Sequence, residues 1–177
     1  MKTIFKNLFL KSYKNDPSKI IFESIISQSR KEVFYRDLKV QDNIDGRFEM
    51  IVLHAFLVTR RMQSNSDMKS FSRDIMTHIF DNFDLSLREV GVGDMGIGKK
   101  IKNIADSLYG SFVAYKDGFD KGEEVLEDAI NRNIYRGKAD KKMLKIMSTY
   151  AFKQNEILNS ISETDLLDGK LTFISPL

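Results

Sequence analysis

Apolar residues recur every three or four positions along most of the chain, which is the spacing that places them on one face of an α-helix. Long stripes of this kind run through residues 45–62, 71–90 and 97–115, and shorter ones cover 123–135 and 140–161. We find no convincing strand or hairpin pattern and no internal repeat. The sequence therefore predicts an all-α protein with about six to eight helices.

Local signals and length refine this picture. Asp16 followed by Pro17 marks a helix start, because aspartate caps the first turn and proline fits the first helical position. A chain of 177 residues suits one domain. We expect a single domain over 1–177, with flanking helices in 1–30 and 140–168 and a short C-terminal tail over 169–177.

The stretch EVGVGDMGIGKKIK, residues 89–102, carries two partial nucleotide-binding motifs. Gly91, Gly93 and Gly96 have the spacing of a dinucleotide-binding fingerprint, and the segment from Gly93 to Lys99 lacks only the last letter of a P-loop. Both motifs need a preceding strand, whereas the residues before this stretch are the end of a helical pattern. These observations disfavour a nucleotide enzyme.

A turn between two helices accounts for the same residues. Gly91 can end one helix in the left-handed conformation, and Asp94 can cap the next. The glycines would let the two helices turn sharply and approach closely. Lys99 and Lys100 then lie near a helix start, where the dipole disfavours cations. A function in binding is one explanation of this pair, and a solvated surface is the other.

The amino-acid composition excludes several kinds of functional site. The chain has no cysteine and two histidines, so thiolate metal sites and disulfides are impossible. No histidine motif for zinc and no catalytic spacing is present, and we expect no catalytic residue, metal or cofactor. His54 is expected to be buried with its hydrogen bonds satisfied, and His78 to pair with Asp74 one helical turn earlier.

The N-terminal segment has basic residues without an acidic one, at Lys2, Lys6, Lys11 and Lys14. The preferred interpretation is a first helix that packs its apolar residues on the core; an amphipathic membrane anchor or an organellar presequence are the alternatives. No apolar run is long enough to span a bilayer. We expect a cytoplasmic protein, with peripheral contact to the inner face of the inner membrane as an open alternative.

Several short motifs occur in one order across residues 30–135. They are Tyr35-Arg36-Asp37, the segment DGRFE from Asp45 to Glu49, His54, Arg60-Arg61, the segment LREVGVGD from Leu87 to Asp94, Lys99-Lys100, and Gly110 with Tyr115. In these features the chain resembles the ubiquinol–cytochrome c chaperone family, in its bacterial form. The flanks carry no comparable landmark.

The resemblance implies a non-enzymatic chaperone that binds newly made, unassembled cytochrome b and assists its assembly into respiratory complex III. It also implies contact with the ribosome exit region and with a small partner subunit, as in mitochondrial members. Two other functions remain open. One is an RNA- or ribosome-binding domain that uses the basic N-terminus and residues 136–145, and the other is an enzyme that uses the glycine loop as a phosphate cradle.

The candidate residues for binding a client or partner each have a structural alternative. Tyr35 could fill the core while Arg36 pairs with Asp37, and Asp45, Arg47 and Glu49 could act as N-cap and dipole partners of their helix. We also expect a cluster of four cations around the glycine loop, at Arg47, Arg88, Lys99 and Lys100. The predicted set is Tyr35, Arg36, Asp37, Asp45, Arg47, Arg88, Gly91, Gly93, Asp94, Lys99, Lys100 and Tyr115.

Overall fold

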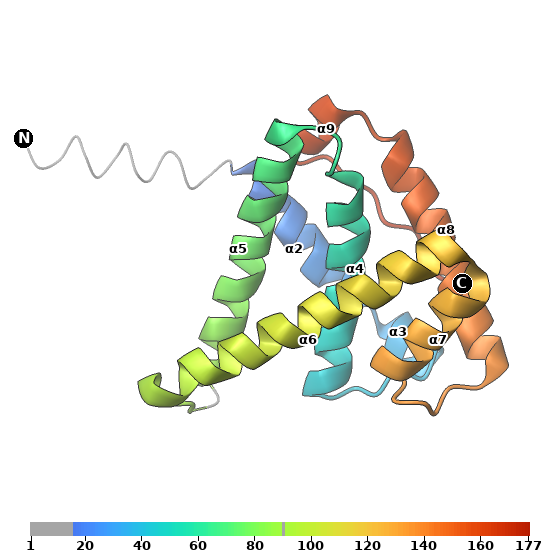
Figure 1. Ribbon diagram of the computed structural model, residues 1–177, viewed down its shortest axis with the longest axis horizontal. Helices are drawn as coiled ribbons and strands as arrows, with labels where there is room; N and C mark the ends of the chain where they lie inside the picture. Colours follow the sequence, from blue (N-terminus) through green and yellow to red (C-terminus); the bar gives the residue numbers. More distant parts are fainter. Residues whose placement is uncertain (1–15, 90) are drawn as a thin grey trace, which may run out of the picture.

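The computed structural model describes residues 16–89 and 91–177, which form one compact helical domain (Figure 1). The predicted all-α class is confirmed, since these residues contain no strand. The helices are α2 (Pro17–Ser29), α3 (Glu32–Arg36), α4 (Ile44–Arg61), α5 (Ser66–Glu89), α6 (Asp94–Lys121), α7 (Glu123–Asn133), α8 (Lys141–Ser160) and α9 (Glu163–Leu167). The predictions for the N-terminal fourteen residues lie outside the described part of the chain.

Helix α4 is the centre of the molecule. It contacts α2, α6 and α8, and α6 crosses it diagonally (Figure 1). The predicted stripe along α4 is buried, but the burial goes further, because every residue from Glu49 to Thr59 is buried. A helix that is covered on all sides needs apolar residues around its whole circumference, and the sequence MIVLHAFLV supplies them.

The start of α4 differs from the expected one. Asn43 is the N-cap, and its side-chain oxygen accepts a hydrogen bond from the Gly46 amide at 2.8 Å. Asp45 lies inside the first turn, where a carboxylate favours the helix dipole. The prediction of Asp45 as the cap is therefore wrong by two residues, while the cap of α2 by Asp16 is confirmed.

The turn between α5 and α6 confirms one prediction and corrects two. Gly91 has φ +84°, the left-handed conformation expected of it. The N-cap of α6 is Gly93, and the Asp94 carboxylate instead accepts a hydrogen bond from Arg88. The glycines of this loop do not bring two backbones together, because a Cβ at Gly91 or Gly93 would meet nothing within 4 Å. The close approach lies at Gly118, where a Cβ would come within 2.6 Å of the Leu126 Cα on α7.

A buried polar network joins α2, α4, α8 and the C-terminal tail. Gln28 donates to the Tyr150 hydroxyl at 2.9 Å, so that hydroxyl is free to donate to His54 Nε2 at 2.7 Å. His54 Nδ1 then donates to the Met50 carbonyl at 2.7 Å, and the prediction of a buried, satisfied histidine is confirmed. Gln28 also donates to the Ile174 carbonyl at 2.8 Å, which holds the tail against the core.

Candidate binding groove

A groove of about 610 Å³ opens between the start of α4, the end of α5 and the first half of α6. This volume falls in the range of about 300–1,000 Å³ that is typical of small-molecule pockets. Most of the lining is apolar. The apolar lining residues are Ile44, Phe48, Ile51, Phe83, Leu87 and Ile104. Ile44 keeps 78% of its surface exposed.

The helix arrangement explains why this groove exists. The end of α5 and the start of α6 lie together at the lower left of Figure 1, and α6 leads from there across α4. The rings of Phe48 on α4 and Phe83 on α5 meet at 5.2 Å between centroids. The three helices thus supply most of the residues that line the groove.

Four cations line the groove: Arg30, Arg47, Lys100 and Arg136. Arg47 binds Asp42 at 2.6 Å and lies over the Tyr35 ring at 5.6 Å from its centroid. The hydrogen bond from Arg47 lowers the pKa of Asp42. Among residues 16–89 and 91–177, Arg30 and Lys100 have no carboxylate within the ion-pair distance of 4.0 Å. Their charge is therefore available to a ligand.

Glu49 also lines the groove, and only 2% of its surface is exposed. Its carboxylate lies 3.7 Å from the Arg136 guanidinium and 3.5 Å from the Ser111 hydroxyl. Burial raises the pKa of Glu49 to about 7, because the attraction of Arg136 does not offset the loss of water around the carboxylate. The groove thus combines apolar walls, cations and one buried acid.

Comparison with known proteins places this architecture in a family. The family model described as ubiquinol–cytochrome C chaperone matches residues 36–173. The chain belongs to this family. The match includes all of α4, α5 and α6, so the groove lies inside the family region except for Arg30. It also extends well past residue 135, where the recognised motifs end.

Individual relatives agree with the family assignment. The chain is 26% identical over 149 residues to Protein CBP3, mitochondrial, from Saccharomyces cerevisiae, and 22% identical to the mouse ubiquinol-cytochrome c reductase complex assembly factor 1. These matches cover 81% and 83% of this chain but only 44% and 50% of the relatives. The crystal structure of the Cbp3 homolog from Brucella abortus superposes with a TM-score of 0.84 at 29% identity, over 97% of both chains.

The structure brings together only some of the residues that were predicted to bind a client or partner. Asp45, Arg47 and Lys100 line the groove, and Tyr35 contacts Arg47. The predicted cluster of four cations is split, since Arg88 and Lys99 are not among the lining residues. Arg88 binds Asp84 and Asp94 at the tip of the hairpin, where Gly91 and Gly93 are also exposed. Lys99 and Lys100 lie in the second turn of α6.

Other predicted residues have structural roles. Tyr35 and Arg36 belong to helix α3 instead of a loop, and Arg36 pairs with Asp37 at 2.9 Å. The Tyr35 hydroxyl donates to the Ser29 carbonyl at 2.6 Å. Tyr115 has no exposed surface, so it packs in the core and cannot contact a partner at the surface.

The prediction for His78 is wrong, because its partner lies far away in the sequence. His78 does not pair with Asp74; it binds Asp16 at 3.0 Å, across the contact between α5 and α2. Among the residues that the structure describes, no group of three or more histidines, aspartates or glutamates is placed to hold a metal ion. No helix in this part of the chain is both long and apolar enough to cross a membrane.

Sequence reasoning treated Glu49 only as a helix-dipole partner and missed its burial. A signal was present, because Glu49 lies three and seven residues before Val52 and Phe56, on the same apolar face of the helix. An acidic residue on a buried stripe is costly to stability and is frequently functional.

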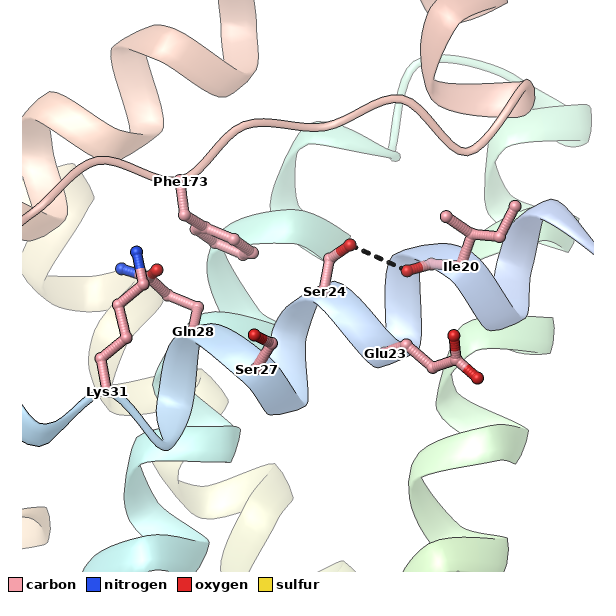
Figure 2. Close-up of a pocket in the computed structure, with 7 residues that line it drawn as sticks. All are labelled: Ile20, Glu23, Ser24, Ser27, Gln28, Lys31 and Phe173. Carbon is pink, nitrogen blue, oxygen red and sulfur yellow. Dashed lines mark hydrogen bonds between the residues drawn. The ribbon is translucent and has the colours of Figure 1, made fainter.

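A second, shallower pocket of about 370 Å³ lies on α2 (Figure 2). Phe173 of the C-terminal tail points toward α2 and forms one of its walls. The Ser24 hydroxyl donates to the Ile20 carbonyl at 2.9 Å, and Gln28 holds the tail, so these polar groups serve the fold. This pocket therefore lies beside the place where the tail packs against α2.

Proposed function

We propose that this protein is a non-catalytic chaperone of complex III assembly and that its groove holds an apolar helical segment of unassembled cytochrome b. Family membership supports the assembly role, and the groove between α4, α5 and α6 is the observation that supports the mode of binding. An amphipathic or apolar helix that lays one face into such a groove is a recurring form of recognition.

The physical reasoning starts from the client. A newly made membrane protein outside its complex exposes apolar helix faces that aggregate in water. The walls formed by Phe48, Phe83 and Ile104 would cover such a face and remove apolar surface from water. Arg30 and Lys100 at the rim favour a segment with acidic or carbonyl-rich ends. We also propose that the protein contacts the ribosome exit region and a small partner subunit.

The competing RNA-binding function has less support. Two of the five cations in its basic segment, residues 136–145, are paired, because Arg136 faces Glu49 and Lys145 binds Glu123. The enzyme alternative required a strand before the glycine loop, and that position is occupied by helix α5.

Two adjacent lysines provide the test. Lys100 lines the groove and Lys99 does not, although both are exposed on the same helix turn. In a crosslinking pull-down from the native host, Lys100→Glu should recover several-fold less cytochrome b than the wild-type protein, while Lys99→Glu should match the wild type. A photoreactive residue at Ile44 should crosslink to cytochrome b, and one at the exposed Tyr109 outside the groove should not.

Equal recovery with both lysine variants would refute the groove as the client site. Recovery of RNA without cytochrome b would refute the chaperone function for this chain.

A further inference from the structure

Glu49 is an incompletely satisfied acid on the wall of the groove. A carboxylate accepts about four hydrogen bonds, yet Glu49 has one contact at 3.5 Å to Ser111 and an ion pair at 3.7 Å to Arg136. Both distances are longer than the 2.7–3.2 Å of a good hydrogen bond. The carboxylate lines the groove, so water or a ligand there completes its environment.

The backbone of Arg136 is fixed by its turn. Its φ is +54°, followed by Gly137 at +78°, a pair of left-handed residues that a non-glycine residue adopts only when the surroundings hold it. The preceding Tyr135 donates its hydroxyl to the Leu38 carbonyl at 2.8 Å, which anchors this turn to the core. The backbone of Arg136 is thus held near Glu49, and its half-exposed guanidinium lies 3.7 Å from the carboxylate without a direct hydrogen bond to it.

The other groups around Glu49 do not supply a close countercharge. From α4 the neighbouring charge is Asp45, which repels a carboxylate. From α6 the facing groups are Ser111, the buried Tyr115 and Lys100, and α5 contributes the uncharged Asn82 and Ser86. Arg30 completes the lining from the end of α2. An ionised Glu49 therefore depends on water in the groove.

We propose that an apolar helix entering the groove is bound together with one proton on Glu49, so that rising pH releases the client. This inference rests on the proposed function. Filling the groove displaces the water that solvates the carboxylate, and an apolar occupant offers no replacement hydrogen bond. Protonation removes the charge, and the neutral acid then lies in an apolar environment at low cost.

The coupling of client binding to the protonation of Glu49 explains why an acid lies among apolar walls. A permanently apolar groove would promote aggregation of the empty chaperone. An acid that ionises near neutral pH keeps the empty groove hydrated and lets it become apolar when it is filled. Burial places the pKa of Glu49 at about 7, so the proton needed for binding costs little at neutral pH.

The probe is a blocked helical peptide of leucine and alanine with glutamates at both ends, which has no group that titrates between pH 6 and 9. Its affinity is measured by calorimetry at pH 6.5, 7.5 and 8.5 in two buffers with different ionisation enthalpies, which counts the protons taken up. The wild-type protein should lose affinity by close to tenfold per pH unit above pH 7, with proton uptake. Glu49→Gln should bind equally at all three pH values without uptake.

Glu156→Gln is the control, because it removes an exposed carboxylate on α8, outside the groove, and should keep the pH dependence. Binding by the wild-type protein that is flat or that strengthens with pH would overturn proton coupling and leave the groove as a client site. If Glu49→Gln bound the peptide with the same pH dependence as the wild type, that result would also overturn proton coupling and leave the groove as a client site. Peptide bound by neither protein at any pH would refute the groove itself, and the inference with it.

Discussion

Replacing Glu49 with glutamine should stabilise the protein at pH 8 and change it little at pH 4.5. The unfolded carboxyl has its ordinary pKa of 4.5, and burial raises the pKa in the folded protein to about 7. Between these values the folded protein holds a proton that the unfolded chain has lost. The contribution of Glu49 to the free energy of unfolding therefore falls as pH rises through this window.

The size of the effect follows from the two pKa values. A difference from 4.5 to about 7 corresponds to about 3 kcal/mol, reached above pH 7. Glutamine has nearly the same shape and no charge, so Glu49→Gln should gain up to about 3 kcal/mol over the wild type at pH 8.

His54 has the opposite pH dependence. Burial lowers its pKa from 6.5 to about 4, so its contribution to stability is complete above pH 6.5 and is lost as pH falls toward 4. Between pH 4.5 and 6.5 the opposite pH dependences of Glu49 and His54 nearly cancel in the free energy of unfolding of the wild type. In the Glu49→Gln variant only the contribution of His54 remains. The free energy of unfolding of this variant should therefore rise by about 1.4 kcal/mol per pH unit in this interval.

Urea unfolding followed by circular dichroism at pH 5, 6.5 and 8 measures these differences. Glu156→Gln, on the exposed side of α8, controls for the loss of one surface carboxylate. A Glu49→Gln protein that is less stable than the wild type at pH 8 would show that Arg136 stabilises the charged acid more than burial destabilises it. A gain of equal size at pH 5 and pH 8 would refute the titration argument.

Other substitutions test the packing and the buried network. Gly118→Ala should destabilise the protein by at least 1–3 kcal/mol, roughly the cost of overpacking, because its Cβ would lie 2.6 Å from a backbone atom of α7. Gly98→Ala, in open space on the same helix, should stabilise it by up to about 1 kcal/mol, and thermal melts that give both variants the same sign would contradict this account. Tyr150→Phe should cost about 1–3 kcal/mol in urea unfolding, since it leaves His54 Nε2 buried without a partner. Tyr109→Phe, at a residue that is 71% exposed, is the control and should be near neutral; an equal loss there would argue against the network.

The sequence alone determined the helices, because helical periodicity and end signals are local properties. The apolar stripes placed the ends of α4 to α8 to within six residues, and the cap of α2 by Asp16 and the left-handed Gly91 were predicted from short-range chemistry. The family motifs are likewise readable in the linear sequence, and the family match bears them out.

Tertiary structure decided which residues meet. Periodicity shows that α4 has an apolar face, but only the packing of α2, α6 and α8 around it buries Glu49 and His54. The same packing separates Lys99 from Lys100, covers Tyr115 and joins His78 to Asp16. The physical reason is that burial and pKa depend on neighbours distant in the chain. The groove, whose walls come from three helices, exists only in the folded molecule.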